Sequence, residues 1–218
     1  VKDPNGYYLD NGWTNPVQNL SEGGKRNAQT DRLYQQASLI IEPIKNWTTH
    51  VEFNYSIKNS SVKETSLPVY NHDIEGNVIN TNKDSYLSQD QTKENYLNLN
   101  IYSEYFHSFN NIHNTKIMLG FQTESMQQEF SSTQKYGVMI GDMPYFDITT
   151  GLDGKGNVKA TKANGNGKRW KTAGFFGRLN YDYMGRYLAE INMRYDGSSR
   201  FRRGSRWQWS PSFSLGWN

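Results

Sequence analysis

Residues 174–201 read GFFGRLNYDYMGRYLAEINMRYDGSSRF, and this stretch decides the fold class. Apolar residues recur at every second position on both sides of Met184, Gly185 and Arg186. A period of two is typical of a β-strand, because successive side chains point to opposite faces. The stretch therefore predicts a β-hairpin with one apolar face. Its odd positions are Ala173, Phe175, Gly177, Leu179, Tyr181 and Tyr183, then Tyr187, Ala189, Ile191, Met193 and Tyr195.

The same alternation occurs in seven segments of the chain. They are residues 32–42, 47–58, 97–105, 117–124, 173–183, 187–196 and 208–217. In these segments the apolar residues favour odd positions, and polar or small residues favour even positions. No helical period competes over a comparable length. The sequence therefore predicts an all-β protein whose seven antiparallel strands share one apolar, odd-numbered face, since a slip of one residue would invert a strand.

Composition leaves two all-β classes open. The 218 residues are only 35% hydrophobic and yet 14% aromatic, and the mean hydropathy is -0.86. A soluble binding module fits this balance, and so does a transmembrane β-barrel, whose strands are apolar only at alternate positions. The chain has no cysteine, which excludes a disulfide framework or a thiolate metal site.

Charge and segment pattern exclude further classes. A formal net charge of +3 is too small and too dispersed to indicate nucleic acid, so we expect no nucleic-acid partner. No run of about 18 apolar residues predicts a spanning helix, which says nothing against a spanning barrel. The chain begins VKDPNG, without a signal peptide, and we expect its start to lie inside a longer protein.

The connections between the predicted strands favour the barrel. Short turns are predicted at about 43–46, 107–114 and 184–186, and they alternate with long polar segments at about 58–94, 126–168 and 197–206. Outer-membrane barrels have short periplasmic turns and long extracellular loops. A soluble sandwich rarely sorts its loop lengths so strictly. We therefore predict a portion of an antiparallel transmembrane β-barrel.

Aromatic residues in the predicted strands gather at two levels. Trp47, Tyr105, Tyr183, Tyr187 and Trp217 fall near the short turns, and Tyr55, Tyr195 and Trp209 fall near the other end. Amphipathic rings at two levels suit the two interfaces of a membrane. The alternative is that they are ordinary strand residues, since Tyr and Trp favour strands.

The long segments contain a repeated motif, Asp-x-x-Gly-Asn-Val, at 73–78 and 153–158. An Asp that bonds its own backbone and a Gly with positive φ predict a tight turn, so each segment is expected to form a small hairpin. A calcium loop is the alternative, but the second copy lacks alternating oxygen ligands, and the Glu at the twelfth position is missing. Turn chemistry explains both copies.

No arrangement of residues predicts catalysis, a metal site or a cofactor. The four histidines form no HExxH motif, and no GxSxG elbow is present. His50 alternates with Glu52, which fits either half of a proton relay or metal site, or a solvated polar face. Basic residues cluster at 168–171 and 200–206, where they either bind lipopolysaccharide phosphates or form a solvated charge run.

Residues Gly174 to Trp217 resemble a known family. The segment GFFGRLNYDYMGRYLAEINMRYDGSSRF followed by RWQWSPSFSLGW is similar to the barrel core of SusC/RagA-type TonB-dependent outer-membrane transporters. There, a strand, a short turn, a strand ending RYDGSSRF and a strand near PSFSLGW occur in that order. The match is dense over about 45 residues, and the upstream strands fit the family's layout without a diagnostic motif.

The resemblance implies a bacterial outer-membrane location and a role in importing oligosaccharides or peptides. It implies a 22-stranded barrel with an N-terminal plug, TonB as the energy source through an N-terminal region, and a SusD-like surface lipoprotein as partner. We therefore interpret residues 1–218 as part of one barrel domain, in contact with outer-membrane lipid, without the plug or the remaining strands.

Two sets of residues follow from this interpretation. The polar side chains expected to face the lumen are Arg178, Asn180, Asp182, Glu190, Asn192 and Arg194. The loop aromatics expected either to stack on ligand or to pack the loops together are Tyr70, Tyr86, Tyr136, Tyr145 and Phe146. A soluble carbohydrate-binding module remains the alternative, with its apolar faces turned inward. An outer-membrane phospholipase would need a Ser/His pair, and no sequence pattern indicates one. We therefore predict that the chain is not an enzyme.

Overall fold

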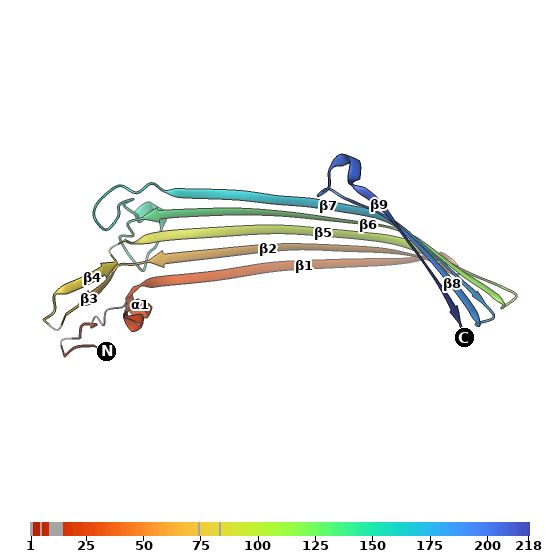
Figure 1. The fold of residues 1–218 in the computed structure, drawn as a ribbon, viewed down its shortest axis with the longest axis horizontal. Helices are drawn as coiled ribbons and strands as arrows, with labels where there is room; N and C mark the ends of the chain where they lie inside the picture. Colours follow the sequence, from red (N-terminus) through yellow and green to blue (C-terminus); the bar gives the residue numbers. More distant parts are fainter. Residues whose placement is uncertain (1, 5, 9–14, 74, 83) are drawn as a thin grey trace. The chain divides into compact units, whose positions relative to one another are not determined.

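A computed structural model of the chain describes residues 2–4, 6–8, 15–73, 75–82 and 84–218. Its main element is a seven-stranded sheet in the order β1-β2-β5-β6-β7-β8-β9, in which neighbouring strands run in opposite directions (Figure 1). The bounds are β1 Gly24–Ile44, β2 Trp47–Ser66, β5 Tyr86–Phe109, β6 His113–Tyr136, β7 Lys162–Tyr183, β8 Tyr187–Ser198 and β9 Trp207–Trp217. The seven predicted strands are therefore confirmed.

Several strands are longer than the alternation indicated. β5 and β6 each have 24 residues, whereas the sequence predicted strands at 97–105 and 117–124. The additional residues are polar on both faces, so they show no period of two, yet the backbone hydrogen bonds of a sheet hold them equally well. The long connections consequently shrink to about 67–85 and 137–161.

Strand register confirms the shared odd face. Between β7 and β8, Leu179 lies opposite Ile191, and between β8 and β9, Ile191 lies opposite Phe213. Side-chain contacts elsewhere obey the same parity, since Phe121 packs on Phe175 with ring centroids 5.1 Å apart. We call this side of the sheet the odd face and the opposite side the even face.

The predicted turn at 184–186 is confirmed. Met184 and Gly185 both have positive φ, at 59° and 66°, and the Arg186 amide donates to the Tyr183 carbonyl over 3.0 Å. Two successive positive φ values match the right-handed twist of the strands, and glycine adopts the second without strain. Asp182 completes the turn by accepting from the Gly185 amide at 2.9 Å.

Smaller elements occupy the connections. They are helix α1 (Pro16–Glu22), the two-stranded sheet of β3 (Val69–His72) and β4 (Val78–Asn82), and the 3-10 turns η1 (Phe146–Ile148) and η2 (Arg203–Ser205). Helix α1 was not predicted. Its signal is the pair Asn15-Pro16, because Asn15 caps the amides of Val17 and Gln18 and proline suits the first helical turn. No helix among the described residues has the length and apolar character needed to span a membrane.

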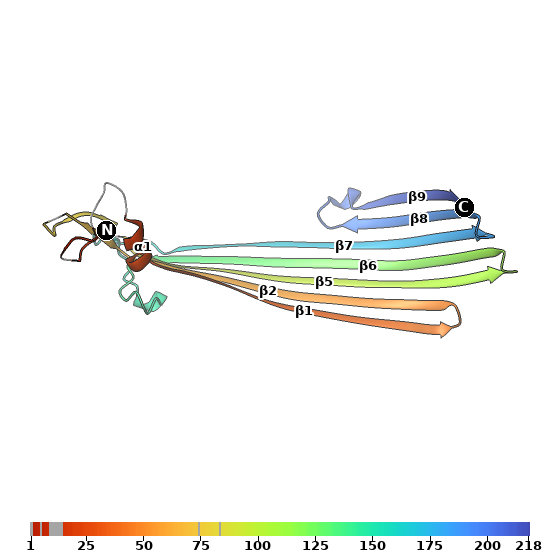
Figure 2. The same ribbon diagram turned by 90° about the horizontal axis from the view of Figure 1, so that it is seen from below.

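The chain divides into two compact units. The boundaries between them fall within the strands β1, β2, β5, β6 and β7, which are drawn in Figures 1 and 2. Unit 1 comprises residues 1–31, 59–93 and 129–166, and unit 2 comprises 32–58, 94–128 and 167–218. Among the described residues, the buried apolar side chains Val69 and Leu87 both belong to unit 1, as do the buried polar side chains Gln18, Asn71 and Thr149. The water-excluded core of the described chain therefore lies in unit 1.

Candidate functional site

The odd face of unit 2 is apolar and uncovered. Phe213 and Leu215 are each 82% exposed, and Ile191 is 50% exposed. A soluble sandwich would bury this face beneath a second sheet, and no described residue of unit 2 provides such a layer. A contiguous apolar surface of this kind marks contact with a membrane or a partner. The structure therefore contradicts the inward-facing apolar layer of the soluble-module alternative.

Aromatic side chains on β8 and β9 lie at two levels of this face. Near the turn, Tyr187 lies opposite Trp217. Near the other end, Tyr195 stacks on Trp207 and Trp209, with ring centroids 4.9 and 4.5 Å apart. Tyr187 and Tyr195 lie eight residues apart on β8, about 27 Å along the strand at about 3.4 Å per residue, or about 19–22 Å along the membrane normal for a strand tilted by about 35–45°. Transmembrane barrels have an apolar band about 25 Å tall between aromatic girdles.

The even face of unit 2 is polar, and it brings most of the predicted lumen residues together. Asn180 donates to Glu190 over 2.6 Å, and Asn192 donates to the other oxygen of Glu190, also over 2.6 Å. Arg178 donates through Nε to Asn192 at 2.7 Å and lies 4.0 Å from Glu190. Every charge in this group has a partner, as a stable polar wall requires.

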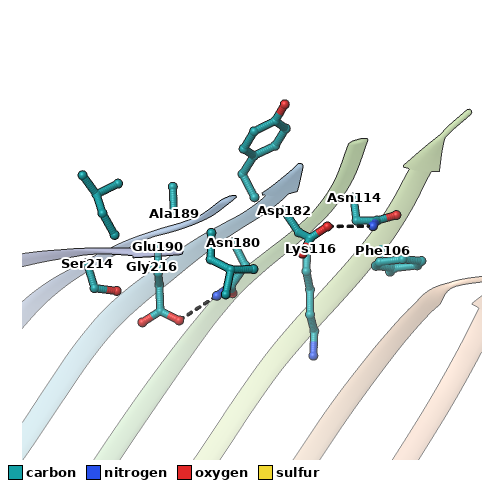
Figure 3. Close-up of a pocket in the computed structure, with 12 residues that line it drawn as sticks. Phe106, Asn114, Lys116, Asn180, Asp182, Ala189, Glu190, Ser214 and Gly216 are labelled. Carbon is teal, nitrogen blue, oxygen red and sulfur yellow. Dashed lines mark hydrogen bonds between the residues drawn. The ribbon is translucent and has the colours of Figure 1, made fainter. Parts of the chain in front are cut away.

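The remaining two lumen residues have other partners. Asp182 accepts from Asn114 on β6 at 3.0 Å, and Arg194 forms a two-bond pair with Asp196 at 3.0 and 3.1 Å. Figure 3 shows the Asn114–Asp182 and Asn180–Glu190 bonds at the side of an open hollow of 430 Å³. The small residues Ser214 and Gly216 on β9 help to line this hollow.

A row of rings crosses the even face, and the sequence did not predict it. His50 on β2 stacks on Tyr102 on β5, with centroids 4.5 Å apart and ring planes 7° apart. The Phe176 ring on β7 lies over Gly120 of β6 and beside Tyr102, and a Cβ at Gly120 would overlap it. Arg194 lies over the Phe176 ring at 5.3 Å. The proton-relay interpretation of His50 loses support, because Glu52 instead accepts from Asn100 at 3.1 Å.

Two of the five predicted loop aromatics meet in unit 1. Tyr86 and Tyr136 pack edge to face with centroids 6.2 Å apart, and Tyr86 donates to Glu64 at 2.6 Å. Lys159 and Lys162 lie over the Tyr136 ring at 4.8 and 5.6 Å. The lysines were missed because they are far from Tyr86 in sequence and have no motif around them.

The other three loop aromatics have separate contacts. Tyr145 is 60% exposed and receives Lys63 over its ring at 4.9 Å. The Phe146 carbonyl accepts from Lys135 Nζ at 3.1 Å. Tyr70 lies on β3, and its carbonyl accepts from Gln18 Nε2 at 2.6 Å. Among the described residues, none of these three makes a ring contact with Tyr86 or Tyr136.

The two long connections of unit 1 are bonded to each other. Ser85 accepts from Gly137 through its carbonyl and from Val138 through its hydroxyl, both at 2.9 Å. Asp84 accepts from the Gly154 amide at 2.9 Å and pairs with Lys159 at 3.2 Å. These two partners hold the pKa of Asp84 below its ordinary value, and Asp84 in turn raises the pKa of Lys159. The connections therefore form one ordered surface.

The repeated motif forms the predicted turn in both copies. Asp73 accepts from the amides of Glu75 and Asn77 at 3.0 and 2.7 Å, and Asp153 accepts from those of Lys155 and Asn157 at 2.9 and 2.9 Å. Hydrogen bonds from the following Asn hold the pKa of each carboxyl below its ordinary value. The first turn joins β3 to β4, and Leu152 bridges Val158 across the second.

Each histidine lies against a tyrosine ring. Centroid distances are 4.6 Å for His72 with Tyr7, 4.5 Å for His50 with Tyr102, 6.3 Å for His107 with Tyr105 and 6.1 Å for His113 with Tyr181. These rings act in packing across the sheet and the loops. Within the described ranges, no three His, Asp or Glu residues are grouped to hold a metal ion.

A single family model covers almost all of the chain. Residues 2–218 match the family model for the β-barrel of TonB-dependent receptor-like proteins. The TonB-dependent receptor SusC of Bacteroides thetaiotaomicron is 56% identical over 43 residues, which are 20% of this chain and 4% of SusC. The TonB-dependent receptor P39 of Formosa agariphila is 26% identical over 188 residues, which are 85% of this chain and 16% of P39.

Solved structures show the same fold. The RagAB peptide importer in its open-open state superposes with a TM-score of 0.75 at 17% identity, covering 87% of this chain and 19% of the importer chain. Its closed-closed state gives a TM-score of 0.73 at 16% identity, covering 88% and 20%. The chain thus spans about a fifth or less of the length of these proteins.

Proposed function

Because the chain belongs to the TonB-dependent receptor-like β-barrel family, and to its SusC/RagA type, we propose that it forms wall and external loops of an outer-membrane nutrient importer. The observation that carries the proposal is the two-sided sheet of unit 2. Its odd face has an apolar band about 27 Å long, measured along β8, between two aromatic levels, which fits lipid. Its even face is a hydrogen-bonded polar wall, which fits a water-filled lumen or a plug.

The mechanism assigns a different task to each unit. The even-face network around Glu190 keeps its charges paired whatever passes along it, so the wall stays hydrated without capturing solute. In unit 1, the exposed rings of Tyr145 and Tyr70 are available for stacking on sugar rings or peptide side chains. The bonds between its two long connections hold those rings on an ordered surface, which lowers the entropic cost of binding.

The remaining parts of the importer are inferred from the relatives. We propose that the intact protein also contains a plug, further strands that close the barrel and a TonB-contacting segment, since this chain spans only about a fifth or less of the length of its relatives. We further propose a SusD-like lipoprotein as partner and either an oligosaccharide or a peptide as cargo; the similarity to SusC and to the RagAB peptide importer supports this proposal. We assign no catalytic role to the chain, since uptake requires binding and gating rather than bond cleavage.

The test removes the exposed rings from the intact importer. Tyr70→Ala combined with Tyr145→Ala is expected to weaken capture by roughly five- to 100-fold, because each aromatic stack contributes about 0.5–1.5 kcal/mol. Binding is measured on outer-membrane vesicles with two probes, fluorescent malto-oligosaccharides and fluorescent casein peptides, and the probe that binds identifies the cargo class.

Val158→Ala is the matched control, because Val158 lies in the same connections, is 84% exposed and has no ring. Capture that is unchanged in the double variant would show that the rings only pack the loops. Cleavage of either probe by the purified protein would overturn the assignment as a transporter wall.

A further inference from the structure

We infer that Arg169 and Lys171 on β7 form a binding site for the phosphate of a lipid headgroup in the outer leaflet. The inference rests on the proposed function, because it requires the odd face of unit 2 to meet lipid. Both residues have odd numbers on β7, so their side chains stand on the same face as Phe175 and Leu179. Both are exposed.

Position along the strand indicates a headgroup. From the turn, the odd positions of β7 run through Tyr183, Tyr181, Leu179, Gly177, Phe175 and Ala173 before they reach Lys171 and Arg169. Tyr183 and Lys171 are twelve residues apart, about 40 Å at about 3.3 Å per residue along a strand that barrels tilt by about 35–45°. Tilt reduces this length to about 30 Å along the membrane normal, which is where the hydrocarbon ends and headgroups begin.

A groove is present at this position. Arg169 and Lys171 line an open groove of 290 Å³ together with Tyr55 and Leu97, which also have odd numbers. The groove therefore combines two cations with the amphipathic ring of Tyr55, the aliphatic side chain of Leu97 and the polar side chains of Asn95, Ser125 and Gln127. That combination suits an amphiphile, whose phosphate meets the cations while its acyl chains follow the apolar face.

The two cations are unpaired by protein. The ion pairs within unit 2 are Lys116–Glu104, Arg178–Glu190 and Arg194–Asp196, so among the described residues Arg169 and Lys171 have no acidic partner. The loop after β8 increases the positive charge nearby. Its Ser199 accepts from the Lys171 amide at 2.8 Å and donates from its own amide to the Lys171 carbonyl at 2.9 Å.

This attachment brings a second basic segment beside the first. Residues 198–206 contain four arginines and no acidic residue. Arg200 itself lies over the Trp170 ring at 5.0 Å, on the even face of β7, so it adds positive charge near the site without entering it. Arginine and lysine bind phosphate oxygens through charge-assisted hydrogen bonds, and the surrounding positive charge attracts the anion. Arg169 and Lys171 differ from the other basic residues in sharing the odd face and lining a groove, whereas Lys168 faces the other side of β7.

The experiment uses the intact importer in dodecyl maltoside, titrated with lipid A and followed by native mass spectrometry. The wild type is expected to retain lipid A, and Arg169→Gln with Lys171→Gln is expected to bind it about 100-fold more weakly, since hydrogen bonds to charged groups contribute roughly a factor of ten each. Lys168→Gln is the matched control. It removes the same charge from the adjacent residue, which faces the other side of β7.

Two further arms identify the source of the phosphate. Lipid A treated with phosphatase is expected to bind as weakly as the double variant does. Inorganic phosphate at millimolar concentration is expected not to displace lipid A, and displacement would overturn a lipid site in favour of a free-anion site. Equal loss in the Lys168→Gln variant would overturn the site by showing that only net charge matters.

The outcome also separates this inference from the proposed function. A double variant that binds lipid A like the wild type, in an importer that still inserts into vesicles and captures ligand, would overturn the headgroup site alone. An intact protein that stays soluble without detergent would overturn both.

Discussion

Unit 1 and unit 2 are built from parts of the same long strands, but they differ in where their apolar side chains lie. Among the described residues, the buried ones lie in unit 1, and many of those in unit 2 are exposed. In unit 2, odd positions carry large apolar side chains that remain exposed, such as Leu119 and Ile191. In unit 1, most odd positions of the same strands carry polar residues, such as Ser131 on β6, and the apolar Leu87, at an odd position of β5, is fully buried. Unit 1 thus has the ordinary arrangement of a protein in water. Unit 2 has the inverse arrangement, which fits the proposed contact of its odd face with lipid.

The comparison teaches that strand formation and face polarity are separate properties. Polar strand ends in unit 1 are joined by side-chain hydrogen bonds, including Ser132 to Asp90 at 2.6 Å and Thr30 with Ser60 at 3.0 Å. Such pairs stabilise a sheet that has water on both sides. The alternation of apolar residues therefore shows where a sheet meets lipid, and not where the sheet ends.

An arginine on the odd face of unit 2 should have the largest effect on stability. If it did not, the proposed difference between the odd faces of unit 1 and unit 2 would be wrong. Ile191→Arg places a charge midway between the aromatic levels of Tyr187 and Tyr195. It should destabilise the protein folded in lipid vesicles, lowering its free energy of unfolding by about 2–4 kcal/mol. Ser131→Arg, at an odd position of unit 1, should change it by less than about 0.5 kcal/mol. Urea titration of the intact protein in vesicles measures both.

Ser212→Arg on the even face of β9 is the second control, since Ser212 lies directly opposite Asn192. Equal costs at Ile191 and Ser212 would contradict the assignment of the odd face to lipid. Dependence of the fold on detergent must be measured alongside, because a buried sandwich core would also reject arginine at Ile191.

A smaller effect is expected from filling the space under the Phe176 ring. Gly120→Ala should destabilise the barrel by about 1–3 kcal/mol, because the new Cβ overlaps the ring and the neighbouring Tyr102. Gly165→Ala in unit 1 should cost less, since its Cβ would meet only the Phe130 carbonyl at 3.3 Å. The same urea titration provides the values.

The double variant Gly120→Ala with Phe176→Ala separates ring overlap from strand propensity. If overlap is the cause, removing the ring should recover most of the cost of the Gly120 substitution. A cost that is unchanged in the absence of the ring would mean that the ring row contributes no packing, and unit 2 would then lack this link between β5, β6 and β7.

The smallest effect concerns the acid sensitivity of the unit 1 turns. Asp73 and Asp153 have a pKa lowered from the ordinary 3.8, so their turns are stabilised above pH 3.8 and lose that stabilisation as the pH falls through the lowered value. Hydrogen exchange of residues 149–161 should therefore show protection that declines in acid, while the β8 amides of unit 2 remain protected.

Asp153→Asn is the informative variant for this pH response. Its side-chain oxygen still accepts from the Lys155 and Asn157 amides but does not titrate, so the local loss of protection in acid should disappear. Protection that declines in acid to the same extent in this variant would assign the pH response to another group.

Sequence reasoning succeeded where each face of a strand has uniform surroundings along its length, because such surroundings give the sequence an alternation with a period of two. The hairpin at 173–196 could be predicted with its turn and its parity, because every odd position meets the same surroundings. The six polar residues predicted to face the lumen share the even face for the same reason, and their exposure to a lumen stays a prediction. Phe176 is a large apolar residue on the even face, and Gly120, which lies 56 residues earlier on the neighbouring strand, makes room for its ring.

Sequence reasoning failed where surroundings are polar on all sides. The outer parts of β5 and β6 resemble loop sequence, because serine, threonine and glutamine are equally suited to either. The contacts of Tyr136 with Lys159 and Lys162 depend on how the connection from 137 to 161 returns to the sheet, and no local pattern records that path. The basic groove likewise needs β7 and the loop after β8 to be adjacent.

The continuous register of β7, β8 and β9 also restricts how such a chain can change over evolutionary time. Inserting or deleting a single residue in the middle of β8 would exchange Ile191-type and Asn192-type positions for the rest of the strand, so lipid would meet amides and the lumen would meet hydrocarbon. Length variation is therefore expected to accumulate in the connections of unit 1 and in the loop after β8, with strands changing by pairs of residues. Under the proposed function, a longer loop could therefore bind a new cargo while the odd and even faces of the wall strands stay the same.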